Sequence, residues 1–136
     1  LGDSVTRLDR WETALNEATP GDPRDTTSPE AMSTTVAALV NGGRLSQGAT
    51  AQLVSWMVSS KTGDAKLRAG LPKDWRTGDK TGAGAHGSVN DVAATWPPGR
   101  KPIVIALYIT DTTSTTDDAN AAMAEVARAV TRTLGY

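Results

Sequence analysis

Apolar residues recur at intervals of three and four in three stretches of the chain, which predicts three amphipathic helices. The first begins at Ser28-Pro29-Glu30, because a capping hydroxyl, a proline at the first position and an early acid favour a helix start. Asn41-Gly42-Gly43 ends it by accepting left-handed backbone angles. The other two begin at Ser46 and near Thr116. The positions that we expect these helices to bury are Met32, Val36, Leu39 and Val40, then Leu53, Val54, Trp56 and Met57, then Ala122, Met123, Val126, Ala127, Val130 and Leu134.

Three further stretches, residues 75–83, 88–96 and 103–110, have the length and composition of strands. The connections between them, at residues 84–87 and 97–100, are short and rich in glycine or proline, so adjacent strands should run antiparallel. The last of the three is apolar on both faces. We therefore expect it to lie centrally in a sheet that is covered on both sides.

These elements predict an α+β fold, an antiparallel sheet with helices packed on its faces. The chain divides into residues 1–27 (a long polar loop and its flanks), 28–72 (a helical segment) and 73–136 (the strands and the last helix), all parts of one unit. Three strands leave two exposed edges, so we expect more strands from residues outside this chain. Leu1-Gly2-Asp3-Ser4 has neither an initiator methionine nor a signal-peptide pattern, and we expect it to lie in the interior of a longer chain.

Composition excludes several classes of function. The 136-residue chain has a net charge of −1 and a pI near 5.8, so it offers no basic field for nucleic acid or for an anionic membrane. No apolar run approaches the roughly 18–20 residues that span a membrane. Cysteine is absent and histidine occurs once, which excludes disulfides and thiolate catalysis and argues against a metal site. We expect no metal and no cofactor.

Two motifs far apart in the sequence carry side chains suited to one chemistry. In the segment from Arg10 to Asn16, Glu12 and Asn16 are spaced i and i+4, which places a carboxylate and an amide on the same side of a helical turn. Such a pair can hold one water molecule between a general base and an orienting amide. In Asp79-Lys80-Thr81-Gly82-Ala83-Gly84, a lysine, a hydroxyl and backbone N–H groups gather at a strand end. That arrangement suits an anionic substrate and a developing oxyanion.

The order of these motifs resembles the C-terminal half of a class A serine β-lactamase, over the whole chain. The match rests on Arg10-x-Glu12-x-x-x-Asn16, on Arg24-Asp25-Thr26-Thr27-x-Pro29 and on Lys80-Thr81-Gly82. Related penicillin-binding proteins share the K-T-G motif but lack the loop. The family's Ser-x-x-Lys and Ser-Asp-Asn motifs do not occur in these residues. The resemblance therefore implies an N-terminal β-lactamase segment that carries both motifs, including the nucleophilic serine.

The resemblance implies roles for individual residues of the loop. Residues 5–25 correspond to the omega loop on the floor of the active site. Glu12 matches the base that activates the deacylating water, and Asn16 matches the side chain that helps to hold this water. Arg10 and Asp25 match the structural ion pair that closes the neck of the loop.

The second motif matches the substrate-binding strand of the family. Lys80 corresponds to its catalytic lysine, whereas Thr81, Gly82 and Gly84 correspond to positions that contact substrate. Ala83 matches the residue whose backbone N–H forms half of the oxyanion hole, and the other half belongs to the missing serine.

One position departs from the pattern of many relatives. These carry an arginine after the K-T-G turn that binds the substrate carboxylate, and Val89 stands there in this chain. We expect Lys66, on the loop that precedes the strand, to supply the cation instead, with Arg68 as the weaker candidate. The simpler interpretation, that Lys66 and Arg68 are a solvated pair, stays open.

Other residues have simpler interpretations. The second Lys-Thr-Gly, at residues 61–63, is expected to be a surface turn. His86 is expected in a hairpin turn at the rim of the site, without a catalytic role. Helical periodicity places Trp56 and Met57 in the core.

The activity implied by the resemblance is hydrolysis of the β-lactam ring of penicillins and cephalosporins through a serine acyl-enzyme, with this chain inactive until it is combined with the N-terminal part. Two alternatives stay open. A D-alanyl-D-alanine carboxypeptidase or other penicillin-binding protein shares K-T-G, although Glu12 with Asn16 speaks against it, since a peptidase has no need to release β-lactams quickly. An inert homologue or complementation fragment is the non-enzymatic alternative. The resemblance also implies a secreted or periplasmic location and no nucleic-acid or membrane partner.

Overall fold

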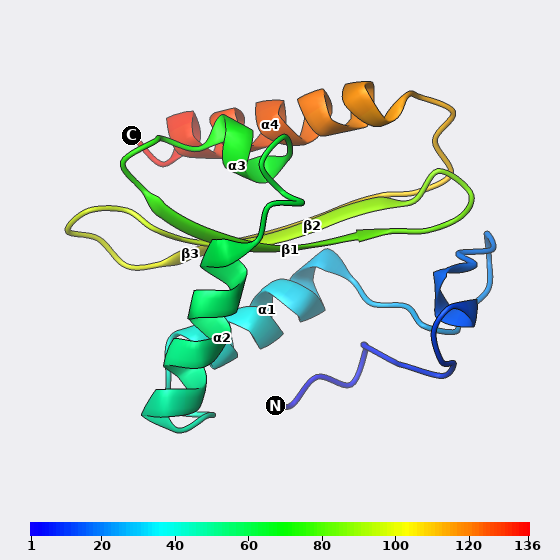
Figure 1. The fold of residues 1–136 in the computed structure, drawn as a ribbon, viewed down its shortest axis with the longest axis horizontal. Helices are drawn as coiled ribbons and strands as arrows, with labels where there is room; N and C mark the ends of the chain where they lie inside the picture. The colour runs from blue at the N-terminus through cyan, green and yellow to red at the C-terminus, as the bar shows by residue number, and fades with distance from the viewer.

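The computed structural model describes residues 1–136 and places one sheet between two layers of helix (Figure 1). Its three strands, β1 (Arg76–Ala83), β2 (Val89–Trp96) and β3 (Ile103–Ile109), are antiparallel and lie in chain order. The sequence-based strand limits are within one residue of these, and the α+β class is confirmed. The prediction that the last strand is central is wrong for this chain. Strand β2 is central, and β3 is a half-buried edge.

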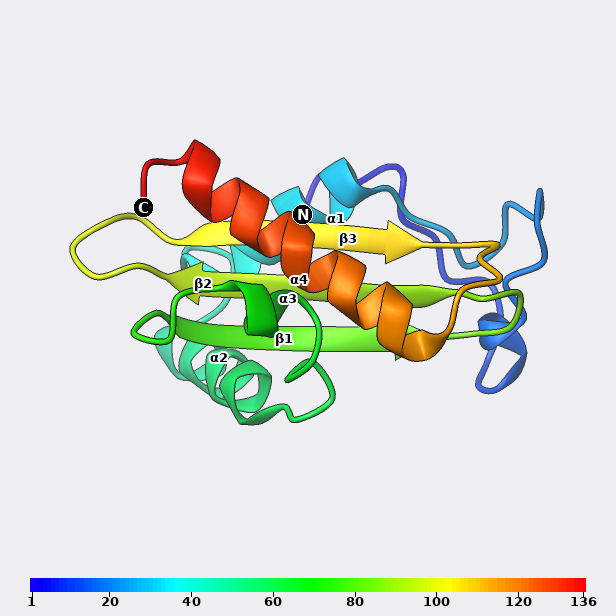
Figure 2. The same ribbon diagram turned by 90° about the horizontal axis from the view of Figure 1, so that it is seen from above.

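Helices α1 (Pro29–Val40) and α2 (Gln47–Ser59) cover one face of the sheet. The short α3 (Leu67–Gly70) and the long α4 (Thr116–Thr133), which crosses the strands obliquely, cover the other face (Figure 2). The predicted start of α1 is confirmed, because the hydroxyl of Ser28 accepts the Ala31 N–H. None of the helices combines the length and hydropathy that a membrane span requires.

The hydrophobic core lies in two parts, one on each side of the sheet, because β2 packs on both of its faces. The strand alternates its side chains between the two layers, so Ala93 faces α3 and α4 while Ala94 faces α1 and α2. The first part consists of Leu67, Leu71, Trp75, Ala93 and Ala127, and the second of Val40, Val54, Met57 and Ala94.

Two predictions about the core are wrong. Trp56 is 66% exposed, since it lies on the side of α2 that no other element of this chain covers. On α4, Ala122, Val126 and Leu134 are exposed. The buried stripe of α4 is rotated from the predicted one toward small residues that allow close approach to α3. It consists of Ala119, Met123, Ala124, Ala127 and Thr131.

The first 27 residues form a long loop whose only regular element is the 3₁₀ turn η1 (Ala14–Asn16). Its ends are joined at Asp25. One oxygen of this carboxylate accepts from Arg10 Nε at 2.6 Å, and the other accepts the N–H groups of Asp9 (2.6 Å) and Arg10 (3.0 Å). Burial by itself raises the pKa of Asp25, but these three hydrogen bonds outweigh it and hold the pKa below its usual value. The neck of the loop is therefore charged and closed throughout the neutral pH range.

We predict that Gly70→Ala destabilises the protein. A Cβ at this position would lie 1.9 Å from the Ala124 carbonyl oxygen of α4, so the two helices would have to move apart. We expect the free energy of unfolding to fall by roughly 2–3 kcal/mol in urea denaturation followed by circular dichroism. Gly48→Ala is the matched control, because its Cβ would meet nothing within 4 Å and should leave stability unchanged or slightly increased. Equal stabilities of the two variants would contradict this packing.

We also predict that Asp25→Asn opens the loop without unfolding the sheet. Asparagine tolerates the left-handed backbone of this residue (φ 56°) but cannot form the ion pair. In hydrogen exchange, the amides of Asp9, Arg10 and Asn16 should exchange about ten-fold faster or more, with β2 unaffected. Asp22→Asn is the control, because Asp22 bonds only locally, to Arg24 and Thr19. Unchanged exchange in Asp25→Asn would show that other contacts hold the loop.

Candidate active site

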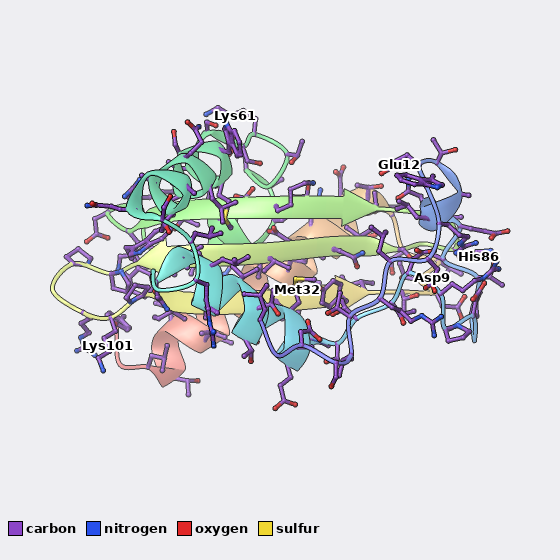
Figure 3. All side chains as sticks on the ribbon, turned by 90° about the horizontal axis from the view of Figure 1, so that it is seen from below. Asp9, Glu12, Met32, Lys61, His86 and Lys101 are labelled. Atoms are coloured by element: carbon purple, nitrogen blue, oxygen red, sulfur yellow. The ribbon has the colours of Figure 1, made fainter.

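The two sequence motifs meet at one end of the sheet. Figure 3 shows Glu12 and His86 at the end where β1 finishes, with Lys101 at the opposite end. The loop and the end of β1 are connected by a backbone hydrogen bond of 2.9 Å, from the Ala85 N–H to the Asn16 carbonyl oxygen. Gly84 permits this approach, because a Cβ there would lie 2.7 Å from the same oxygen.

Glu12 and Asn16 form a pair within the loop. Asn16 Nδ2 donates to Glu12 Oε2 at 2.6 Å, the contact that the i, i+4 spacing predicts. The turn is held by hydrogen bonds from the Leu15 N–H to Trp11 and from the Asn16 N–H to Thr13. The Glu12 side chain is exposed, so water reaches its carboxylate. A carboxylate with an amide beside it can accept a proton from a water molecule that both groups hold.

The K-T-G residues lie near the C-terminal end of edge strand β1. Lys80 is exposed, and its ammonium donates to the Thr81 carbonyl oxygen. The Thr81 hydroxyl donates to Thr62 Oγ1 at 2.6 Å. An exposed ammonium and a hydroxyl at a free strand edge can bind a carboxylate.

A cleft of ≈ 990 Å³ runs from the loop past β1 to helices α1 and α2. Its size is at the upper end of small-molecule sites. Glu12 stands beside the cleft rather than in its lining, whereas Asn16 lines it. The other predicted site residues in the lining are Arg10, Asp25, Lys80, Thr81, Gly82, Ala83 and Gly84. One cleft thus gathers the loop and strand motifs.

Lys66 and Arg68 do not line this cleft. Lys66 is only 8% exposed, and its ammonium donates to Asn120 Oδ1 of α4 at 2.5 Å. Arg68 bonds Asp79 instead, with its guanidinium 2.5 Å from the carboxylate. The interpretation of the two as a solvated pair is therefore wrong, because each has a separate partner. A role for Lys66 as the substrate cation stays a prediction, and it requires the ammonium to reach past Asn120.

Sequence reasoning missed two residues around the K-T-G strand. Thr62 belongs to the second Lys-Thr-Gly and was expected in a simple surface turn, yet its hydroxyl accepts from Thr81. Asp91 lies fully buried in β2, opposite Thr81. The available signal for Asp91 is an acid in a strand whose other polar residues are the uncharged Asn90 and Thr95. His86, as expected, is an exposed turn residue, and its carbonyl oxygen accepts the Asp111 N–H.

Comparisons with known proteins agree with this geometry. The family model described as "Beta-lactamase enzyme family" matches residues 1–134. Beta-lactamase AST-1 of Nocardia asteroides is 52% identical over 135 residues, which cover 99% of this chain and 44% of the relative. Beta-lactamase CTX-M-6 of Salmonella typhimurium is 47% identical over 131 residues, 96% of this chain and 45% of the relative. The chain spans less than half the length of these curated relatives.

The solved structures give the same result for the fold. An ancestral class A β-lactamase (GNCA) superposes with a TM-score of 0.94 and 57% identity, over 97% of this chain and 51% of that one. A second ancestral class A enzyme (GNCA4) gives a TM-score of 0.95 at 56% identity, over 98% of this chain and 51% of that one. With the loop and K-T-G motifs meeting at one cleft, the conclusion is that this chain belongs to the β-lactamase enzyme family, in the class A serine group.

Proposed function

We propose that this chain is part of an enzyme that hydrolyses the β-lactam ring of penicillins and cephalosporins through a serine acyl-enzyme. Its contribution is the deacylation base and the K-T-G strand. The observation that carries the proposal is the hydrogen bond between the Ala85 N–H and the Asn16 carbonyl oxygen, which joins the loop of Glu12 to the strand of Lys80. Hydrolysis of an anionic acyl-enzyme needs a general base near an anion-binding strand edge, and here Glu12 stands beside the cleft that Lys80 and Thr81 line.

The chemistry assigned to these residues has two stages. Lys80 and Thr81 bind the substrate carboxylate while a serine from outside this chain attacks the lactam carbonyl. The ring C–N bond breaks, and the proton of the serine hydroxyl is transferred to the ring nitrogen. The Ala83 N–H donates to the developing oxyanion. Glu12 then takes a proton from a water molecule held with Asn16. The resulting hydroxide attacks the ester carbonyl, the serine oxygen leaves and is reprotonated, and the opened acid is released.

We propose that the serine, in a Ser-x-x-Lys motif, and a Ser-Asp-Asn motif come from an N-terminal β-lactamase segment that packs on α1, α2 and β3. Three observations support this partner. The relatives are about twice as long as this chain. Trp56 lines the cleft and is 66% exposed, and large exposed apolar side chains are typical of unfilled interfaces. Strand β3 is apolar and has a free edge, which can pair with a further strand.

We also propose a secreted or periplasmic location for the complete protein. The support is membership of the family alone. Fractionation of cells that express the gene from its own start codon tests this location.

The first prediction of this proposal is activity on assembly. We expect no hydrolysis of a chromogenic cephalosporin by this chain alone. A chimera in which the N-terminal part of Beta-lactamase AST-1 precedes Leu1 should turn the substrate over at about 1 s⁻¹ or faster. Its control replaces the Ser-x-x-Lys serine with alanine and should be inactive. A chimera that is folded by circular dichroism but inactive would contradict the proposed function.

The second prediction concerns the base. In the chimera, Glu12→Ala should still react once with penicillin but should deacylate roughly 10²–10⁴-fold more slowly, the range for loss of a general base. Stopped-flow absorbance should show one rapid turnover per enzyme, and mass spectrometry should show the stable adduct. Glu30→Ala, at an exposed glutamate of α1, is the matched control and should behave as the parent chimera does. Wild-type turnover in Glu12→Ala would assign the base elsewhere.

A further inference from the structure

A cluster of charged and polar side chains lies buried between the sheet and helices α3 and α4, on the face opposite α1 and α2. Asp79 of β1 is 1% exposed and Asp91 of β2 is fully buried. Arg68 pairs with Asp79 at 2.5 Å, and Lys66 donates to Asn120. None of these five residues has a role in the two-stage chemistry above.

Asp91 holds the loop that leads into α3. Its Oδ2 accepts the Leu67 N–H at 3.1 Å, so it fixes the residue directly after Lys66. Its second oxygen, Oδ1, has no hydrogen-bond partner, and neither does Oδ1 of Asp79. A buried carboxylate oxygen without a donor is costly while the group is ionised, and a bound proton removes that cost.

The position of Asp91 connects this cluster to the substrate strand. In the β1–β2 register, Asp91 lies directly opposite Thr81, and Asp79 lies on the same face two residues before Thr81. Side chains of directly opposed residues are neighbours, with Cβ atoms about 5 Å apart. The Thr81 hydroxyl lies on the same face of the sheet as Asp91, because it donates to Thr62 in the loop before α3. Asp91 holds the end of that loop through the Leu67 N–H. A charge on Asp91 therefore changes the electrostatic potential at the K-T-G residues.

The surroundings of Asp91 place its ionisation in the physiological range. Burial, and then the neighbouring Asp79 carboxylate, raise the pKa of Asp91 to about 7, against the Leu67 hydrogen bond and the charges of Lys66 and Arg68. The other charged group beside the cluster is Asp64, which lies 3.7 Å from Arg68. Helix α4 contributes the neutral Asn120, and β3 presents Leu107 in the register position opposite Asp91.

We propose that Asp91 is a positioning residue, whose charge state sets how strongly the Thr81 end of the K-T-G strand attracts the carboxylate of a β-lactam. This inference rests on the proposed function. Arg68 pairs with Asp79 and lies 3.7 Å from Asp64, so with Lys66 the four charges around Asp91 balance. With Asp91 neutral, the cluster is net neutral. With Asp91 ionised, it carries one net negative charge and attracts an anion less.

The test is the pH dependence of KM for benzylpenicillin in the chimera described above. We expect KM to rise roughly 3- to 10-fold from pH 6 to pH 8, with a much smaller change in kcat, as Asp91 becomes charged within about 10 Å of the substrate carboxylate. In Asp91→Asn the rise should disappear and KM should stay at its low-pH value. Asparagine keeps an oxygen that accepts the Leu67 N–H, so a purely structural role would not remove the pH step.

Glu125→Gln is the matched control. It removes one carboxylate from the exposed side of α4, where hydrogen bonds from Arg128 and Arg132 keep the pKa of Glu125 low. This variant should retain the wild-type pH step. A flat KM profile in the active wild-type chimera, or an unchanged step in Asp91→Asn, would overturn the inference and leave the proposed function standing.

A measurement without turnover separates the two proposals. Both parts use the chimera whose Ser-x-x-Lys serine is replaced by alanine, because it binds a β-lactam without hydrolysing it. Carbon-13 NMR of its side-chain carboxyls should show Asp91 titrating near neutral pH. Benzylpenicillin binding, followed through the amide signals of Thr81 and Gly82, should be tighter at pH 6 than at pH 8. This experiment needs no folded Asp91 variant. An inactive parent chimera contradicts the proposed function, and equal binding by the alanine chimera at the two pH values overturns the role of Asp91 whether or not the parent is active.

Discussion

The candidate site depends on one backbone hydrogen bond, from the Ala85 N–H to the Asn16 carbonyl oxygen. This bond anchors a long irregular loop to the most regular part of the molecule, the end of β1. It forms because Gly84 has no side chain to keep the two segments apart. Without it, the Glu12 carboxylate and the Lys80 ammonium would belong to separate surfaces. With it, residues far apart in the sequence have a fixed mutual geometry.

The second constraint is that buried charges around the sheet are paired or held by backbone groups. Asp25 closes the loop through Arg10 and two N–H groups, and Asp79 is neutralised by Arg68. Because removal of one partner leaves a buried charge uncompensated, these contacts fix the loops on both sides of β1. Asp91 differs from these two aspartates, since no cation forms an ion pair with it and its one hydrogen bond comes from the Leu67 N–H. It lies on β2, directly opposite Thr81 of the K-T-G strand.

The predictions made from sequence succeeded where local chemistry decides the outcome. Helix caps such as Ser28, the glycine- and proline-rich turns and the i, i+4 spacing of Glu12 and Asn16 depend on neighbouring residues only. They failed where burial depends on elements elsewhere. The exposure of Trp56 and the edge position of β3 follow from what is packed beside them, and periodicity cannot show this. The partners of Lys66 and Arg68 were likewise invisible, because they come from α4 and β1.

The most direct test is a crystal structure of the chimera acylated by a slowly hydrolysed β-lactam. We expect the acyl carbonyl oxygen to lie within about 3 Å of the Ala83 nitrogen. We also expect one water molecule that is hydrogen-bonded to both Glu12 and Asn16 and faces the ester carbon. An acyl group directed away from β1, or a Glu12 carboxylate with no water between it and the ester, would contradict the claim that these two motifs form one active site.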